Sequence, residues 1–391
     1  MFHSQKAWTM IPILLGNKPL ISLSVPVYGT ESSLPALLDS VLEQGLLLGS
    51  VNDSLIFNPK KTLRSLRPLR LNKKDRTSDQ SGFPLIEILI VNDGSPAGGS
   101  LPTILKPYKK KFKAVGIPLI LLEHSKNLGL VEARRTAVQA ASGTYLCFAD
   151  SDDTLPPDAL LHLYNGLLAS GTGSPADAAD IIHGKAEYKT GFSDEDAPLY
   201  KEAPLAEMDE KIKKVHIGLL EGDELLNSFL LKRELSSFLW AKLFRTEAVK
   251  AAFADIPHTF CTMGEDLLIY FFILLHARSY FGIGDTVYNY HIGTGISSNR
   301  EIKDLARWER ACTAASVFAV IFSYLEEHPL SAPNAEKLTA ALQNRCKTAL
   351  LQNLRHLKRV IPSLRDEAYA ILCDYWGEEY VNAAEKSMKN R

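Results

Sequence analysis

Two aspartates lie two positions apart in "YLCFADSDDTLPP", residues 145–157, where an apolar run ends. In an extended segment the side chains at positions i and i+2 project to one face, so Asp150 and Asp152 can converge. Two carboxylates, completed by phosphate oxygens, form the usual shell of Mg²⁺ or Mn²⁺ in proteins. The same acids could instead cap a helix that begins after Pro156 and Pro157. Taken alone, the motif leaves both interpretations open.

Apolar, β-branched segments recur along the first half of the chain and predict buried strands. Each ends in polar or turn-forming residues, and they span residues 19–29, 84–99, 117–124 and 144–153. Helical patterns lie between them. Strands that alternate with helices predict an α/β fold, with a mainly parallel sheet flanked by helices. Because ligands of such sheets bind outside the carboxyl ends of the strands, we expect a binding site at the acidic pair.

The composition is that of an ordinary globular protein, since 46% of the 391 residues are hydrophobic and 23% are charged. A formal net charge of −1 attracts no nucleic acid, so none is expected as a partner. The five scattered cysteines show neither metal-ligand spacing nor a disulfide framework, which fits a reducing cytoplasm. The longest apolar runs, 267–277 and 311–325, are shorter than the roughly 20 residues that span a bilayer. Without a recognisable signal-peptide cleavage site, we expect a cytoplasmic protein, either soluble or peripheral.

Two polar stretches interrupt the strand and helix pattern. One is a predicted insertion at about residues 47–83, and the other is an acidic excursion at about 190–215. Within the insertion, residues 60–76 carry eight basic residues and one acid, with leucines between them. This segment could be a solvated loop. It could also contact anionic lipid, because each Lys or Arg near such a surface gains roughly 1 kcal/mol.

Five segments occur in the order found in a known enzyme family: "ISLSVPVYGTESSLPALLDSVLEQ", "IEILIVNDGS", "NLGLVEARRTAVQAASGTYLCFADSDDTLPPDAL", "WAKLFR" and "GEDLLIYFFILL". In this order they resemble bacterial family 2 glycosyltransferases. The resemblance implies a GT-A fold, with a mainly parallel nucleotide-binding sheet, over residues 19–300. An N-terminal extension (1–18) would precede this domain, and a helical C-terminal region (301–391) would follow it.

The family resemblance also implies an activity. It predicts an inverting hexosyltransferase that uses a nucleotide-sugar donor, by family habit a UDP-sugar, and Mn²⁺ or Mg²⁺. The acceptor would be a hydroxyl of a saccharide or a lipid-linked saccharide, in the synthesis of cell-surface polysaccharide. Such an enzyme would work in the cytoplasm, with peripheral contact at the inner face of the membrane through residues 60–76.

The resemblance assigns donor-side roles to residues at the ends of the predicted strands: Pro26, Tyr28, Glu31, Asp93, Arg134, Asp150, Ser151 and Asp152. Asp93 corresponds to the aspartate that contacts the nucleotide base, although an Asp before Gly also suits a turn. Asp150 and Asp152 correspond to the metal and donor motif. His291 is an additional metal-ligand candidate, with a structural role as the alternative. Arg135 stands where the family pattern has asparagine.

The resemblance places the catalytic base at Asp266, with Glu265 beside it on the acceptor side. Adjacent helical positions point about 100° apart, so we expect only one of the two acids to face the donor. Both could instead simply favour the positive end of a helix. Trp240 is an acceptor-side candidate whose alternative role is in the core. Lys242, two positions later, is expected at the surface.

Two other functions remain open from the sequence. A nucleotidyltransferase also combines an α/β sheet with Mg²⁺, but its phosphate loop is usually rich in Gly and basic residues. The corresponding segment here, "VPVYGTESS", has neither Lys nor Arg. A degenerate transferase acting as a non-catalytic scaffold would be expected to lose its acids, yet Asp93, Asp150, Asp152 and Asp266 are all present.

Overall fold

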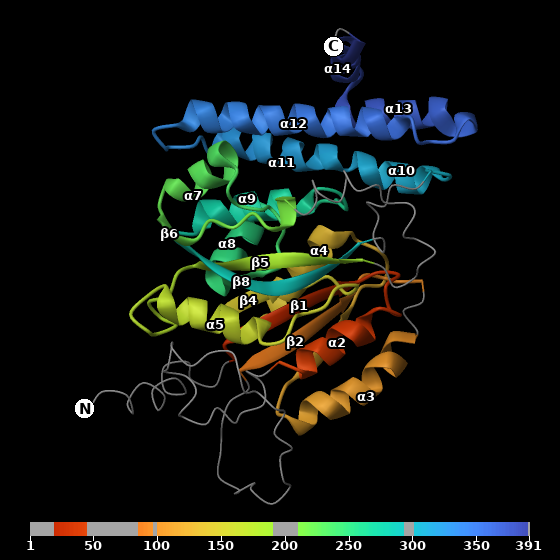
Figure 1. Cartoon of the computed structure of the whole chain (residues 1–391). Helices are drawn as coiled ribbons and strands as arrows, with labels where there is room; N and C mark the ends of the chain where they lie inside the picture. Colours follow the sequence, from red (N-terminus) through yellow and green to blue (C-terminus); the bar gives the residue numbers. More distant parts are fainter. Residues whose placement is uncertain (1–18, 45–84, 97–99, 191–209, 293–300, 390–391) are drawn as a thin grey trace, which may run out of the picture.

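The computed structural model describes residues 19–44, 85–96, 100–190, 210–292 and 301–389. The predicted N-terminal extension, the insertion at about 47–83 with its basic segment 60–76, and most of the excursion at 190–215 lie outside these ranges. Within them, a central sheet is covered on both faces by helices, and further helices follow towards the C-terminus (Figure 1).

Eight strands form one sheet in the order β3-β2-β1-β4-β7-β5-β8-β6. Their bounds are β1 Ile21–Val27, β2 Ile86–Asn92, β3 Leu119–Glu123, β4 Tyr145–Phe148, β5 Ile181–Thr190, β6 Gly218–Glu221, β7 Lys242–Arg245 and β8 Ser279–Ile292. β7 is antiparallel to both neighbours and β6 is antiparallel to β8, while the other pairings are parallel. The predicted mainly parallel α/β fold is therefore confirmed.

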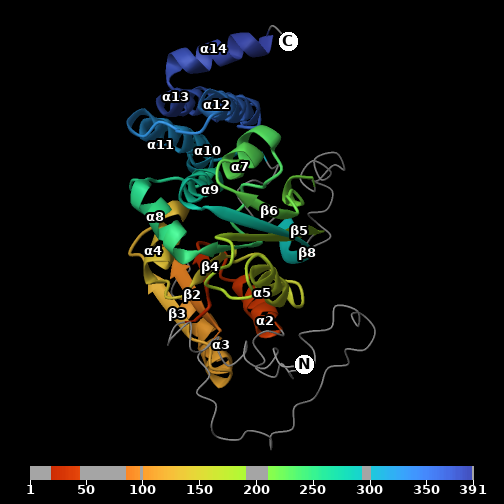
Figure 2. The same cartoon turned by 90° about the vertical axis from the view of Figure 1, so that its left-hand side faces the viewer.

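Helices cover the two faces of the sheet because side chains alternate along each strand. In β2, Ile88 and Ile90 pack in one core, while Leu89 and Val91 pack in the other. The first core contains α2 (Leu34–Leu42), α3 (Leu101–Ala114) and α5 (Ala159–Ala169). The second contains α4 (Leu130–Ala140), α7 (Glu224–Leu226), the π-helix η4 (Asn227–Lys232), α8 (Thr246–Asp255) and α9 (Glu265–His276). Figure 2 shows these two layers on opposite sides of the strands.

β1 continues through Pro26 because the neighbouring strand has already ended there. Ser24 accepts the backbone N–H of Ala149 at 3.0 Å, just beyond the end of β4, whereas Val27 accepts that of Asp93 from the β2 side. Alternate residues of β1 thus bond to opposite neighbours, and Pro26 faces the side that β4 no longer occupies. Its missing N–H removes no bond of the sheet. β1 can therefore extend beyond the end of β4 without losing a hydrogen bond.

The C-terminal region is helical, as predicted, and packs on the α8–α9 side of the sheet (Figure 1). Its helices are α10 (Leu305–Cys312), α11 (Ala314–Glu327), α12 (Ala335–Leu357), the 3₁₀ helix η5 (Pro362–Leu364), α13 (Arg365–Trp376) and α14 (Glu378–Lys389). α9 is apolar on nearly every side because it lies between the sheet and α11. Within the described ranges, no helix combines the length and apolar character needed to cross a membrane.

Candidate active site

Loops from three adjacent parallel strands are joined by side-chain hydrogen bonds. After β1, the hydroxyl of Thr30 lies 2.6 Å from that of Ser151, which follows β4. Ser95, after β2, accepts the backbone N–H of Gly29 at 2.7 Å and donates to the carboxylate of Glu31. The predicted donor residues Glu31 and Ser151 therefore share one edge of the sheet. The sequence analysis did not single out Thr30 or Ser95, although both occupy the polar stretches at strand ends.

The end of β1 carries two further predicted donor residues. Pro26 is buried within the strand, and Tyr28 lies just beyond it with 43% of its surface exposed. An exposed aromatic ring at a ligand-binding edge can stack on a planar base. The donor-binding roles of both residues stay predictions.

Asp93 holds the segment that leads into α4. The side chain is almost completely buried, and its carboxylate accepts hydrogen bonds from the backbone N–H groups of Leu128 at 2.9 Å and Gly129 at 3.0 Å. The imidazole of His124 also contacts it at 2.7 Å. Asp93 therefore ties the end of β2 to the start of α4, which fixes the position of α4 and of its arginines. Its predicted contact with a nucleotide base stays a prediction.

Arg134 on α4 joins the acidic motif to the first turn of α9. Its guanidinium is 1% exposed and lies 3.2 Å from Asp150 Oδ1 through Nη2. Nη1 lies 3.0 Å from Glu265 Oε1 and 3.0 Å from Asp266 Oδ1. Four predicted site residues, from three separate elements, thus form one cluster. Because one buried cation is shared among three carboxyl groups, the ionisation of each acid depends on the other members of the cluster.

The two acids of α9 both contact the same nitrogen of Arg134, while the expectation that only one of them faces the donor stays a prediction. Glu265 and Asp266 begin the helix after Gly264, at adjacent positions. The longer side chain of Glu265 bridges the angle between these positions. Both carboxylates therefore lie within one ion-pair cluster, and their separate roles depend on their protonation.

Burial raises the pKa of Asp266 to about 7, against the opposing effect of Arg134. Glu265 adds to the rise, while Lys242 and the backbone N–H of Leu239 oppose it. Burial likewise raises the pKa of Asp150 well above its usual range. A carboxylate with a pKa near neutrality can accept a proton and later release it, which is what general base catalysis requires.

Lys242 is completely buried, so the expectation that it lies at the surface is wrong. Its ammonium donates to the hydroxyl of Ser236 at 3.1 Å and to the carbonyl of Phe238, and lies 5.1 Å from the ring centroid of Tyr270. Burial lowers the pKa of Lys242 to about 7, while the charge of Asp266 opposes that shift. Lys242 is buried because it begins β7, and β7 lies in the interior of the sheet between β4 and β5.

A second group of predicted residues surrounds Tyr288 of β8. The indole of Trp240 is 2% exposed and stacks on the rings of Phe238 and Tyr288, with centroids 4.4 and 4.8 Å away. The hydroxyl of Tyr288 donates to Asp153 at 2.7 Å and accepts the backbone N–H of Asp150 at 3.0 Å. Trp240 thus packs behind the acidic motif. Its predicted acceptor-side role stays a prediction.

Asp153 anchors the acidic motif to β8, a role that the sequence analysis missed. It is 1% exposed and accepts the backbone N–H of His291 at 2.7 Å. Nδ1 of His291 lies 3.7 Å from the same carboxylate. The sequence feature that could have indicated this role is the third aspartate of "DSDD", which is Asp153. The metal-ligand role of His291 stays a prediction.

Asp150 and Asp152 could hold a divalent cation together with a ligand. Both side chains are partly exposed, and Asp150 contacts Arg134 through Oδ1. Across the described part of the chain, no group of three or more His, Cys, Asp or Glu side chains is arranged to bind a metal. Mg²⁺ is usually held by one or two carboxylates plus substrate phosphates, rather than by an all-protein cage. The two aspartates fit that kind of shared site.

The contacts of Arg135 account for the arginine that stands where the family pattern has asparagine. Its guanidinium donates to the backbone carbonyls of Phe253, Ile256 and Pro257 at 2.5, 2.9 and 3.1 Å. The side chain therefore binds the C-terminal end of α8 and the segment that leads towards α9. Glu132 contacts Arg135 from one helical turn away. In this chain the residue after Arg134 has a structural role.

The family model "Glycosyl transferase family 2" matches residues 61–202. This part of the chain is therefore similar to glycosyltransferase family 2. The matched range includes β2, β4 and the acidic motif, but it ends before Glu265 and Asp266. The place of these two acids in the site therefore rests on the geometry around Arg134.

The chain is also similar to curated glycosyltransferases and to solved structures. "Putative glycosyltransferase EpsH" of Bacillus subtilis is 24% identical over 283 residues, which cover 70% of the chain and 61% of EpsH. A poly(ribitol-phosphate) beta-glucosyltransferase of Bacillus spizizenii is 30% identical over 146 residues, 37% of the chain and 17% of that protein. The chain thus spans less than two thirds of either relative. S. aureus TarS 1–349, in complex with UDP-GlcNAc, aligns with a TM-score of 0.47 and 17% identity, over 94% of the chain and 92% of TarS.

Proposed function

We propose that the chain transfers a sugar from a nucleotide-sugar donor, a UDP-sugar, to a hydroxyl of a saccharide or lipid-linked saccharide. Transfer proceeds with inversion and with a divalent cation. The observation that carries this proposal is the Arg134 cluster, which ties Asp150 of the acidic motif to Asp266 at 3.2 and 3.0 Å. The acidic motif, which we propose binds the donor, and a carboxyl group with a pKa of about 7 therefore contact the same guanidinium.

Asp266 is the general base of the proposed reaction. It takes the proton of the acceptor hydroxyl as the new bond forms between that oxygen and C1 of the sugar. The bond between C1 and the diphosphate oxygen breaks in the same step, and the nucleoside diphosphate leaves with that electron pair. A single displacement inverts the configuration at C1 and needs no enzyme nucleophile. Burial of Asp266 beside Arg134 keeps its pKa at about 7, in the range where a base is effective near neutral pH.

The donor is held by the loops at the carboxyl ends of β1, β2 and β4. Asp150 and Asp152 would hold Mn²⁺ or Mg²⁺, which would supply positive charge to the departing diphosphate. Arg134 orients Asp150, and Asp153 fixes the motif to β8. Tyr28, Glu31 and Ser151 would line the nucleotide, at the edge where their loops meet.

The cellular role of the proposed transferase is the synthesis of cell-surface polysaccharide from the cytoplasmic side. This proposal draws on the match of residues 61–202 to the family 2 model and on the relative named as a poly(ribitol-phosphate) beta-glucosyltransferase. A lipid-linked acceptor would bring the protein to the inner face of the membrane. Contact through residues 60–76 concerns a segment outside the described ranges.

Calorimetric titration with UDP, with and without Mn²⁺, tests donor binding and the role of the metal. Mutation of residues that only hydrogen-bond to a metal's ligands typically lowers metal affinity or activity by about 10–100-fold. Asp152→Asn would remove a proposed ligand itself, so it should weaken UDP binding in Mn²⁺ by at least about tenfold. Asp158→Asn is the matched control, because this aspartate starts α5 in a left-handed conformation that Asn also adopts. Equal UDP affinity with and without Mn²⁺ would contradict the metal proposal. Consumption of nucleoside triphosphate with release of pyrophosphate would favour a nucleotidyltransferase.

A further inference from the structure

α3 carries a dense group of positive charge on its outer face. Between residues 101 and 122 the sequence has five lysines and no Asp or Glu, in a chain whose net charge is −1. All five lysines are exposed, whereas the buried face of the helix consists of Leu101, Leu105, Tyr108 and Phe112. The positive charge is therefore concentrated on the solvent side of one amphipathic helix.

Four of these lysines form one stripe along the helix. At about 100° per residue, Lys106, Lys109, Lys110 and Lys113 fall within one arc of roughly 100° on the exposed part of the helix. Lys111 points to the other flank, where it lies 3.1 Å from Asp39 of α2. We call the four residues the lysine stripe. Lys111 provides a control position with the same residue type on the same helix.

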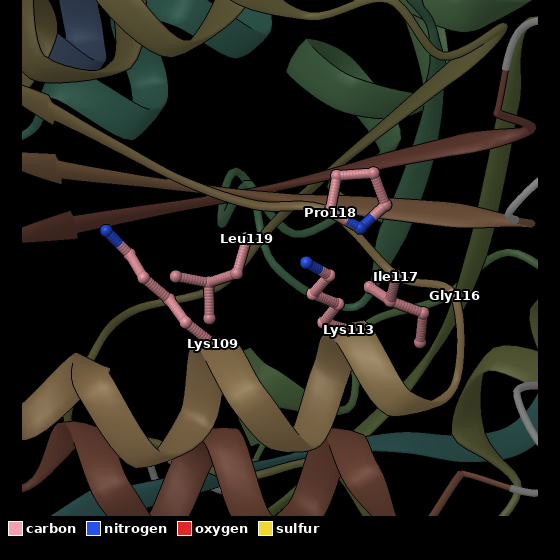
Figure 3. A pocket seen from close by; sticks show the side chains of 6 residues that line it. All are labelled: Lys109, Lys113, Gly116, Ile117, Pro118 and Leu119. Carbon is pink, nitrogen blue, oxygen red and sulfur yellow. The ribbon is translucent and has the colours of Figure 1, made fainter.

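The lysine stripe borders a hollow between α3 and the edge strand β3. The hollow has a volume of about 410 Å³ and is lined by Lys109, Lys113, Gly116, Ile117, Pro118 and Leu119. Figure 3 shows the two lysine side chains rising from α3 towards the segment that begins β3. Val115, in the turn between the two elements, is 40% exposed. Ammonium groups therefore stand beside an apolar, open surface.

The hollow is separate from the candidate active site. It lies at the start of β3, whereas the acidic motif follows the carboxyl end of β4, and β3 and β4 run in the same direction. The hollow therefore lies at the amino ends of the parallel strands, whereas the proposed donor site lies at their carboxyl ends. α3 also forms an outer layer of the molecule, on the far side from α12–α14 (Figures 1 and 2).

We propose that the lysine stripe and the adjoining hollow bind an anionic membrane surface. Phosphate groups of the lipids would contact Lys109 and Lys113, while the apolar hollow and Val115 would face the region just below the headgroups. Charge complementarity favours this occupant, because each exposed lysine near an anionic lipid surface gains free energy of binding. The stripe contains no arginine, the residue that planar, bidentate recognition of nucleic acid prefers. The proposal does not depend on the transferase activity.

Vesicle co-sedimentation of the full chain tests this inference without any transfer assay. Binding to phosphatidylcholine vesicles is compared with binding to vesicles containing phosphatidylglycerol, at low and moderate salt. Roughly 1 kcal/mol per lysine corresponds to about fivefold in affinity. The double variant that carries Lys109→Gln and Lys113→Gln should therefore bind anionic vesicles about 25-fold more weakly than the wild type. Lys111→Gln is the matched control and should leave vesicle binding close to that of the wild type. Raising the salt should weaken wild-type binding, because exposed charges are screened.

Several outcomes would overturn the inference. Equal binding to neutral and anionic vesicles, or an equal loss in Lys111→Gln and in the double variant, would exclude a specific role for the stripe. Soluble glycerophosphoglycerol carries the same phosphate without acyl chains, so it should compete only weakly. Full competition at equal concentration would identify a site for small phosphate anions instead. Unchanged circular dichroism of the double variant excludes loss of folding as the cause of weak binding.

Discussion

Replacing Asp266 with Asn keeps the shape of the side chain and removes its charge and basicity. If Asp266 is the base, kcat should fall by at least about a hundredfold, since a positioned base typically contributes 10²–10⁴-fold. UDP binding should change little, because the proposed donor-binding residues Asp150 and Asp152 follow β4, whereas Asp266 begins α9. In the wild type, kcat/KM should decline as the pH is lowered through about 7, the pKa of the Asp266 carboxyl.

The same substitution has a predictable effect on stability. The folded pKa of about 7 lies roughly 3 units above the ordinary value of about 3.9, and each unit is worth about 1.36 kcal/mol. Because the folded-state pKa of Asp266 is raised, its contribution to stability is fully present below pH 4 and is lost as pH rises through 7. The loss approaches ~4 kcal/mol. Asp266→Asn does not titrate, so relative to the wild type it should gain stability across this range.

Urea unfolding of the wild type and Asp266→Asn at pH 5 and pH 8 measures this difference. The free energy of unfolding of the variant, relative to the wild type, should be higher at pH 8 than at pH 5. A pH-independent difference, or a variant that is relatively less stable at pH 8, would refute the proposed burial of an ionised Asp266. Glu265→Gln is the matched control for activity. If Glu265→Gln is inactive while Asp266→Asn is active, the roles of the two acids are reversed.

Two further substitutions test the charges around the base. Arg134→Met leaves Asp150, Glu265 and Asp266 without their shared cation, so stability should fall by about 3–5 kcal/mol at pH 8, by urea unfolding. The loss should be smaller at pH 5, where protonation can neutralise Asp266; an equal loss at both pH values would contradict the ion-pair account. Lys242→Met removes a buried charge that lowers the pKa of Asp266, so the acidic limb of the kcat/KM profile should move to higher pH. A profile that keeps its midpoint while the melting temperature changes would show that Lys242 has only a structural role.

The parallel half of the sheet could be predicted because its signals are local. β1, β2, β3 and β4 each correspond to an apolar run that ends in polar residues, and β-branched runs between helices are typical of parallel strands. The buried helix α9 could also be predicted, since its segment is apolar on all sides. The insertion of antiparallel β7 between β4 and β5 could not, because strand order depends on pairings between distant segments.

The ion pairs of the site could not be predicted from the sequence either, because they join residues that are far apart in the chain. Arg134 and Glu265 are 131 positions apart, and no local pattern indicates that they meet. Lys242 was expected at the surface because charged residues are rarely buried, yet β7 carries it into the interior. The sequence did indicate that Asp93 and Asp150 each follow the end of a predicted strand. That places both at the carboxyl ends of the parallel strands, but it does not identify the side chains that they contact.

The measurement that most directly tests the central claim is nucleoside diphosphate release from a panel of UDP- and GDP-sugars, supplied with Mn²⁺ and saccharide acceptors. The account predicts acceptor-dependent release of UDP by the wild type. It also predicts a glycoside of inverted anomeric configuration by NMR, and a loss of at least about a hundredfold in Asp266→Asn. Release that is unchanged in Asp266→Asn and in Glu265→Gln, or a product that retains the configuration of the donor, would contradict it.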